Sequence, residues 1–145
     1  MIFQIKYIAS SSRLLPIPHQ LLRKCLLLMA NALSQKYPPM AQEIWRYLVD
    51  DGIIGKANDC FMSCLGPTNI LSFPGEDGLP AGLLLSCDTF RRECLLYGQK
   101  AAEHLIRLLA HGLCHVAGLD HGAKMDEETD KLVILAQEAL EDSIL

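Results

Sequence analysis

The chain has 145 residues, of which 50% are hydrophobic and 21% are charged, and its formal net charge at pH 7 is −4. This length suits one domain with its own core, so we expect residues 1–145 to form a single domain. The negative net charge argues against the class of proteins that bind nucleic acid mainly through a basic surface. The most apolar run, residues 25–33, is shorter than the roughly 18 residues of a membrane span, and the N-terminus lacks a secretory signal. We therefore expect a cytoplasmic protein.

Hydrophobic periodicity predicts strands and helices that alternate along much of the chain. Strands are predicted where β-branched, aromatic or other apolar residues alternate or form a short run, and helices where apolar residues recur every three or four positions. Prolines mark several boundaries: Pro38 and Pro39 end the first helix, and Pro74 ends a strand. In chain order we predict a strand at 1–8 that is broken by the serines at 10–12, a helix at 18–37, a strand at 43–49, a short helix at 53–64, strands at 68–73 and 82–87, a short helix or turn at 88–98, and helices at 99–117 and 126–141.

This order predicts an α+β fold with about four strands and about five helices, in which the helix at 99–117 packs across the sheet. The last helix opens with Asp126, Glu127 and Glu128. Acidic residues in a first turn complement the helix dipole, so we expect these three to be structural rather than catalytic.

Three of the five histidines lie in the segment H-G-L-C-H-V-A-G-L-D-H at positions 111–121. At about 100° per residue, His111 and His115 project from nearly the same side of a helix, close enough to share one cation. His121 can join them only if the helix ends and the chain turns back. Gly118 stands where that turn is needed, because glycine adopts the left-handed conformation at little cost.

Three neutral imidazoles are best suited to zinc, with other first-row divalent metals as alternatives. We therefore predict that His111, His115 and His121 bind one Zn²⁺ per chain. Three protein ligands leave a fourth position for water, which is typical of a catalytic zinc site. Such a zinc activates its water and polarises a carbonyl or phosphoryl oxygen, so the motif predicts a hydrolase, although it assigns no catalytic base.

The spacing of the histidines equals that of the metzincin proteases, H-E-x-x-H-x-x-G-x-x-H, but Gly112 replaces their glutamate base. Peptide hydrolysis by that mechanism needs a group that takes the proton of the water and returns it to the leaving amine. A metallopeptidase is therefore disfavoured. Phosphodiester cleavage depends less on one such base, because a metal and positive charges stabilise the developing phosphoryl charge.

The cysteines form no C-x-x-C pair and lie mostly in apolar surroundings, so we expect reduced and mostly buried thiols. The six are Cys25, Cys60, Cys64, Cys87, Cys94 and Cys114. Cys60 and Cys64, four residues apart, are a less favoured alternative metal pair. Cys114 adjoins a histidine but points about 100° away from it, and is expected in the core.

Structural roles are expected for most of the other polar residues near these motifs. Asp120 either orients a ligand imidazole or caps the turn. His104 lies two turns before His111 and is not expected to be a fourth ligand. Ser72 is expected to be structural or to contact substrate, and Glu76 and Glu103 remain open as bases.

The segment at 111–121 resembles the H-G-x-L-H-L-x-G-Y-D-H signature of the YbeY family, bacterial metal-dependent endoribonucleases of rRNA maturation and ribosome quality control. A second block, P-T-N-I-L-S-F-P at 67–74, is similar to the family's P-T-D/N-V-L-S-F-P. The order of the elements outside the blocks also agrees, so the resemblance covers most of the chain. It implies a zincin-like helix on the sheet and zinc on the three histidines. It also implies single-stranded rRNA, at the 3′ end of the small-subunit rRNA, as substrate and the ribosome or its small subunit as partner, with no membrane and no small-molecule cofactor.

Cys114 and Leu119 depart from the family signature by tolerable apolar changes, and two other departures bear on the substrate side of the site. Met62 stands where the family has an arginine associated with activity, and Leu83 where it has an aspartate. The candidates to replace the missing charge are Arg91, Arg92 and Arg107. Candidate positive charge for local attraction of RNA lies at Arg13, Arg23, Lys24, Arg46, Arg91, Arg92, Lys100 and Arg107. We predict a zinc-dependent endoribonuclease of rRNA, with a ribosome-associated assembly factor, whose metal is mainly structural and whose nuclease activity is weak or lost, as the alternative.

Overall fold

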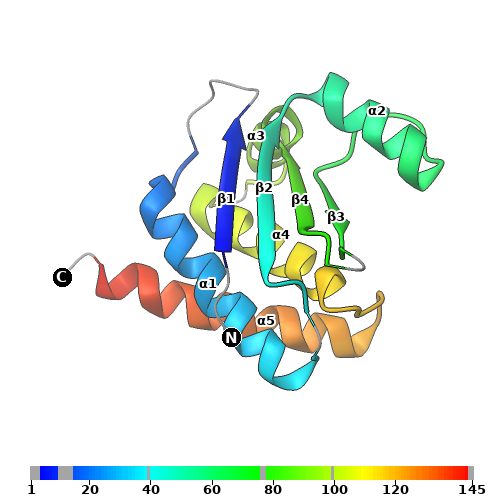
Figure 1. Ribbon diagram of the computed structural model, residues 1–145. Coiled ribbons are helices and arrows are strands. Elements are labelled where there is room, and N and C mark those ends of the chain that lie inside the picture. The colour runs from blue at the N-terminus through cyan, green and yellow to red at the C-terminus, as the bar shows by residue number, and fades with distance from the viewer. Residues whose placement is uncertain (1–3, 10–14, 39, 76–77, 99, 144–145) are drawn as a thin grey trace.

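The computed structural model (Figure 1) describes residues 4–9, 15–38, 40–75, 78–98 and 100–143, and for residues 4–9 it describes the backbone only. Within these residues the fold is α+β, as predicted, with four strands and five helices. In chain order they are β1 (Gln4–Ala9), α1 (His19–Lys36), β2 (Glu43–Val49), α2 (Asp51–Met62), β3 (Ile70–Phe73), β4 (Ala81–Ser86), α3 (Cys87–Leu96), α4 (Ala101–Val116) and α5 (Ala123–Asp142). No helix in this part of the chain is long and apolar enough to cross a membrane.

The strands form one mixed sheet in the order β1-β2-β4-β3. β1, β2 and β4 are parallel, whereas β3 pairs antiparallel with β4, with Ser72 opposite Leu83. Parallel neighbours need a crossover connection, and α1 provides it between β1 and β2. After β3 the chain reverses near Gly75, whose φ is +76° and where a Cβ would lie 2.6 Å from the carbonyl oxygen of Leu79. Glycine is therefore needed at this turn.

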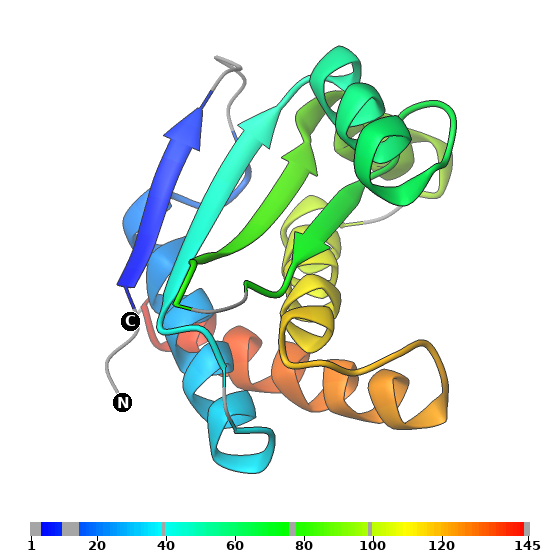
Figure 2. The same ribbon diagram turned by 45° about the vertical axis from the view of Figure 1, so that its right-hand side comes forward.

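The two faces of the sheet are covered unequally. Helices α1 and α4 pack on one face, and α5 packs against these two helices (Figure 2). On this face Ile44 and Leu48 of β2 join the main core, and the buried Arg46 lies between them on the same side. The opposite face carries a smaller core, formed by Val49, Ile54 and Leu71 under α2. Because α2 is the one described helix that packs there, part of this second face is left uncovered by helices.

Each predicted element is present, with boundaries that differ by up to three residues. α2 begins two residues earlier than predicted, because the carboxylate of Asp50 accepts a hydrogen bond from the Ile53 amide at 2.8 Å and caps the helix. α5 begins three residues earlier, because the Gly122 carbonyl already accepts the first helical hydrogen bond, from Asp126. The parts of the predictions that concern residues 1–3, 10–12 and 99 lie outside the described residues.

All six cysteines are free thiols. Cys25, Cys87 and Cys114 are buried, as predicted, whereas Cys60 and Cys64 are exposed. The expectation that the thiols are mostly buried was wrong for this pair, because it lies on the solvent side of the end of α2 and in the segment that follows it.

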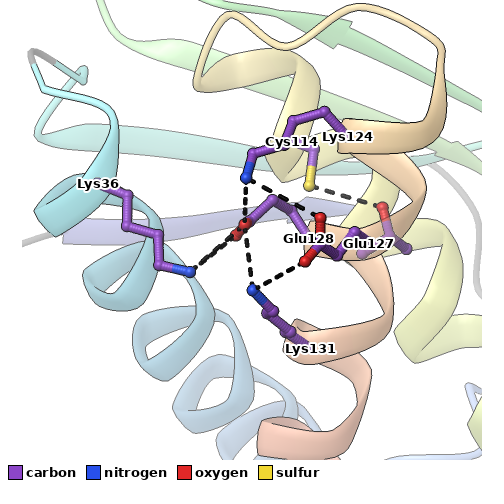
Figure 3. A network of polar contacts seen from close by, with 7 residues as sticks. Lys36, Cys114, Lys124, Glu127, Glu128 and Lys131 are labelled. Atoms are coloured by element: carbon purple, nitrogen blue, oxygen red, sulfur yellow. Dashed lines mark hydrogen bonds and ion pairs between the residues drawn. The ribbon is translucent and has the colours of Figure 1, made fainter.

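A buried carboxylate joins α1 to α5 (Figure 3). The Glu128 side chain on α5 is only 3% exposed, and the Lys36 amine on α1 donates to its two oxygens at 3.4 and 3.3 Å. The amines of Lys124 and Lys131 each lie 3.7 Å from the same carboxylate. Glu128 thus anchors the first half of α5 on α1, close to the point where the histidine segment ends. This agrees with the prediction that the acidic start of the last helix is structural.

These contacts change the pKa of Glu128. Burial by itself would raise this pKa, but the hydrogen bond and charge of Lys36 and the charges of Lys131 and Lys124 outweigh burial and lower the pKa below its ordinary value of 4.5. A carboxyl with a lowered native pKa stabilises the fold above its unfolded-state pKa. That stabilisation is lost as the pH falls through the native pKa.

We expect Glu128→Gln to lower the free energy of unfolding by about 1–2 kcal/mol at pH 7, because it removes a buried charge shared by three half-exposed lysines. The difference between the variant and the unchanged protein should shrink in acid, below about pH 4.5, as the native carboxyl takes up its proton. Chemical denaturation at a series of pH values measures both effects.

Glu127→Gln is the matched control, because Glu127 pairs with the same Lys124 and Lys131 but is 57% exposed. It should change the free energy of unfolding by less than about 0.5 kcal/mol. Equal losses in the two variants would contradict the role assigned to the buried carboxylate.

Candidate metal centre

The helix α4 carries two of the three motif histidines one turn apart. Its apolar stripe, which includes Leu105, Leu109 and Leu113, is buried in the main core, and this fixes the direction in which His111 and His115 project. Both histidines are half-buried at the wall of a cavity. The predicted helix and its predicted apolar stripe are confirmed.

The chain turns back after α4 as the sequence predicts. Gly118 has a φ of +93°, and its amide donates to the carbonyl oxygen of His115 at 2.9 Å. The amide of Leu119 donates to the carbonyl oxygen of Cys114 at 3.0 Å. These hydrogen bonds close the end of the helix and bring His121 back beside the other two rings.

The three rings face one another. Their centroids are 4.9 Å apart for His111 and His115, 5.3 Å for His111 and His121, and 4.7 Å for His115 and His121. One potential ligand nitrogen from each ring lies within 4.8 Å of the others. Around a tetrahedral zinc, nitrogens about 2.1 Å from the metal are roughly 3.4 Å apart, so small rotations of the side chains bring the three to bonding distance. The three imidazoles fit a first-row divalent metal.

In the described part of the chain, this is the one group of three or more histidine, cysteine or acidic side chains that could hold a metal ion. The alternative pair, Cys60 and Cys64, has no such third ligand there. His104 is also outside the group: its Nε2 lies 3.0 Å from a carboxylate oxygen of Glu93. The prediction that His104 is not a fourth ligand agrees with this arrangement.

The surroundings keep two of the rings neutral. Burial lowers the pKa of His111, and the nearby His115 and His121 lower it further, against the opposing charge of Asp126. Burial and the neighbouring His121 lower the pKa of His115 as well. Neutral imidazole is the form that binds metal, so both rings remain competent at lower pH than an ordinary histidine.

A backbone contact orients one ligand. Nδ1 of His115 lies 3.1 Å from the carbonyl oxygen of Leu119, which can only accept a hydrogen bond. Nδ1 therefore carries the proton and donates it, which leaves Nε2 of His115 for a metal. Asp120, which was predicted to orient an imidazole or cap the turn, is exposed. Its charge opposes, but does not reverse, the lowering of the pKa of His115. The contact that orients His115 comes from the Leu119 backbone.

The histidines lie at one side of a cavity of about 440 Å³ between α4, β3 and the end of α2. Its other walls come from the end of α2 and from the segment that leads through β3, namely Met62, Thr68, Asn69, Ile70, Leu71, Ser72 and Pro74. Apart from the histidines, these described lining residues include no side chain that can carry a charge at neutral pH. The cavity therefore offers three imidazoles that could hold a metal, together with hydroxyl and amide groups and apolar contacts.

The strand β3 is tied to α4 and α3 by polar contacts that the sequence did not reveal. The Ser72 hydroxyl donates to the carbonyl oxygen of Gly112 at 3.0 Å, which agrees with its predicted structural role. The amide nitrogen of Asn69 donates to both carboxylate oxygens of Glu93 at 3.2 Å, and the same carboxylate contacts His104. Glu93 thus holds the start of β3, and with it one wall of the cavity. No local sequence signal pairs these residues, because they come from three separate elements.

The position of the missing protease glutamate is packed against the sheet. A Cβ on Gly112 would lie 2.9 Å from Leu83 Cδ2, 3.0 Å from Ile70 Cδ1 and 3.1 Å from Ser72 Oγ. A glutamate there would have to displace these side chains, of which Leu83 is fully buried. The structure thus supports the argument against a protease mechanism of the metzincin type.

The candidate basic residues that the structure describes do not converge on the cavity. Arg46 is buried in the sheet, the guanidinium of Arg92 donates to Asp51 at 2.7 Å, and that of Arg107 donates to Asp130 at 2.9 Å. None of the candidates within the described residues lines the cavity. Arg13 and the candidate base Glu76 lie outside the described residues, and Glu103 is exposed on α4 and absent from the cavity wall.

A family model described as Endoribonuclease YbeY matches residues 8–143. The chain belongs to this family. Proteins named Endoribonuclease YbeY are similar to it: that of Nitratidesulfovibrio vulgaris is 43% identical, with 65% of this chain and 73% of the relative covered. That of Lawsonia intracellularis is 44% identical, with 64% and 71% covered. The predicted membership of the YbeY family and the predicted hydrolase class, a nuclease, are thus confirmed.

The fold is also that of a solved structure. The solution structure of TM1509 from Thermotoga maritima matches with a TM-score of 0.65 at 18% identity, and the match covers 97% of this chain and 93% of that one. This likeness supports the α+β fold of the YbeY chain.

The departures from the YbeY pattern at positions 62 and 83 can be placed in the structure. Met62, at the position of the family arginine, lines the cavity and is 41% exposed. Leu83, at the position assigned to the family aspartate, is fully buried and lies closest to Gly112. The first departure removes a charge from the cavity, and the second fills space between the sheet and α4.

We expect Gly112→Glu to lower the free energy of unfolding by more than about 3 kcal/mol, because it overpacks the contact between α4 and β3 and buries a charge. Thermal or chemical denaturation measures the loss, and the variant should gain no peptidase activity. Gly52→Glu is the control, because Gly52 is also helical but exposed, and a Cβ there would come no closer than 3.4 Å to another group. If Gly112→Glu folds and is as stable as Gly52→Glu, the contact between α4 and β3 does not exclude a side chain at position 112.

Proposed function

We propose that residues 1–145 act as a single YbeY-like domain that cleaves single-stranded RNA with one bound Zn²⁺, held by His111, His115 and His121. The proposed substrate is rRNA, at the 3′ end of the small-subunit rRNA, and the proposed setting is the cytoplasm, in ribosome maturation and quality control with the ribosome or its small subunit as partner. The observation that carries the proposal is the convergence of three imidazoles at the wall of an open cavity in a chain of the YbeY family.

When bound, a zinc with three protein ligands supplies an activated water and stabilises negative charge on a phosphoryl oxygen. The chain contributes neutral imidazoles, of which His115 is oriented by the Leu119 carbonyl. It also contributes a cavity wall that contains the hydroxyls of Thr68 and Ser72. No described side chain of this wall offers a carboxylate as general base, which suits phosphodiester cleavage better than peptide hydrolysis.

Metal-loaded protein is expected to cleave single-stranded RNA, and His115→Ala is expected to lose both tight zinc binding and cleavage, because two ligands cannot complete the site. Titration calorimetry with Zn²⁺ and gel analysis of an RNA substrate measure the two effects. His19→Ala is the matched control. It also removes a histidine, but His19 is exposed at the start of α1 and does not line the cavity. RNA binding without cleavage under any divalent metal would refute the proposal.

A second candidate function is a ribosome-associated assembly factor whose metal is mainly structural and whose nuclease activity is weak or lost. It is favoured by Met62, which replaces the family arginine at a cavity whose described walls lack any lysine or arginine. A His111→Ala protein that keeps its fold, loses cleavage and still supports ribosome maturation in cells would favour this function. Loss of maturation together with cleavage would favour the nuclease.

A further inference from the structure

A second cavity, of about 380 Å³, lies on the thinly covered face of the sheet, beside α2. The chain contains four phenylalanines, four tyrosines and one tryptophan. Four of these nine rings, those of Trp45, Tyr47, Phe61 and Phe73, line this cavity, which we call the aromatic groove. The smaller core on this face accounts for Tyr47 and Phe73, which pack against it, but not for Trp45 and Phe61.

The rings are arranged as pairs with an open side. Trp45 and Tyr47, two residues apart on β2, have centroids 6.3 Å apart and planes inclined by only 21°. Phe61 on α2 meets Phe73 on β3 edge to face, with centroids 5.5 Å apart and planes at 81°. Phe61 nevertheless remains 70% exposed. An aromatic side chain that contacts another ring and still leaves most of its surface exposed is suited to stack on a further flat ring.

The aromatic groove and the metal cavity meet at shared walls. Phe61 lines the groove, and the next residue, Met62, lines the metal cavity. Phe73 lines the groove, while Ser72 and Pro74 on either side of it line the metal cavity. The two cavities are therefore separated by the short strand β3 and the last turn of α2. A strand of nucleic acid with a phosphate at the histidines reaches the groove by crossing this wall.

The chemistry of the groove distinguishes between occupants. None of its described lining residues is charged, so it has no partner for the side chains of acidic or basic peptides. Single-stranded RNA places its charges on the backbone and its flat bases beside it, and proteins that bind single strands stack these bases on aromatic side chains. Phosphates can remain in water outside the groove while the bases enter it.

We propose that the aromatic groove is a base-stacking subsite for single-stranded RNA, in which Phe61 stacks on a nucleobase next to the phosphate at the metal centre. The inference rests on the proposed function, because it takes RNA as the ligand. It goes further in placing bases on the face of the sheet opposite the histidines, and in assigning recognition to stacking rather than to lysine or arginine contacts.

The experiment uses the full chain without metal, so that the RNA stays intact. Trp45 is the only tryptophan of the chain and lines the groove, so its fluorescence reports directly on bases that enter. A short oligouridylate is titrated into the protein and compared with an abasic oligonucleotide of the same length, which carries the same phosphates. We expect the oligouridylate to quench Trp45 and the abasic strand to leave its emission unchanged.

Three variants separate stacking from other effects. Phe61→Leu removes the ring but keeps an apolar side chain at an exposed position, and should weaken oligouridylate binding by about tenfold, as for the loss of one stacking contact. Phe61→Tyr keeps the ring and should restore the affinity. Leu96→Ala is the matched control, because Leu96 is 73% exposed on α3 and lines neither cavity; its affinity should not change.

The outcomes also separate this inference from the proposed function. Equal affinity of Phe61→Leu and the unchanged protein, equal quenching by the abasic strand, or quenching by an apolar peptide but not by RNA would overturn the subsite. If metal-loaded protein still cleaves RNA in any of those cases, the proposed nuclease stands without the subsite. Ring-dependent RNA binding by a protein that cleaves no RNA with any metal would support the subsite and refute the nuclease.

Discussion

The close approach of α4 to β3 at Gly112 determines where the metal centre can form. A Cβ at this position would lie 2.9 Å from the buried Leu83, so glycine lets the helix pack directly against the edge of the sheet. Since His111 and His115 lie on the same turns of α4, this approach places the strand and the segment before it opposite the imidazoles and makes them the far wall of the cavity. The same contact occupies the space that a protease glutamate would need. One packing contact therefore both shapes the cavity and disfavours a metzincin mechanism.

The third ligand depends on what happens after the helix. Gly118 adopts a φ of +93°, the chain reverses, and His121 returns to within reach of the other two rings. The segment is then held from its far end, because α5 begins at Ala123 and is anchored on α1 through the buried carboxylate of Glu128. Glu128 is outside the cavity, but its ion pairs hold the helix that directly follows the histidine segment.

Charge is arranged differently from the usual RNA-binding surface. The chain is acidic, Arg92 on α3 and Arg107 on α4 are paired with aspartates, and the described walls of both cavities lack lysine and arginine. In the proposed reaction, the metal is then the main positive charge near the scissile phosphate. Affinity for RNA would come from the metal and from stacking, and would depend less on salt than binding by many phosphate contacts. At the end of α2, Met62 stands where the family has a charged arginine, and the exposed ring of Phe61 is adjacent to it in the chain. Both side chains offer RNA an apolar contact and no charge.

The sequence by itself determined the elements, the turn at Gly118 and the candidate ligands, because these follow from local rules: the helical period sets the spacing of His111 and His115, and glycine permits the reversal. The family resemblance, carried by two short motifs, was equally readable. Only the tertiary structure decided that Glu93 holds the start of β3, that Gly112 lies against the sheet, and that rings from β2, α2 and β3 share one groove. Those contacts join residues far apart in the chain. They depend on which strands become neighbours and which face each helix covers, and no local periodicity encodes either.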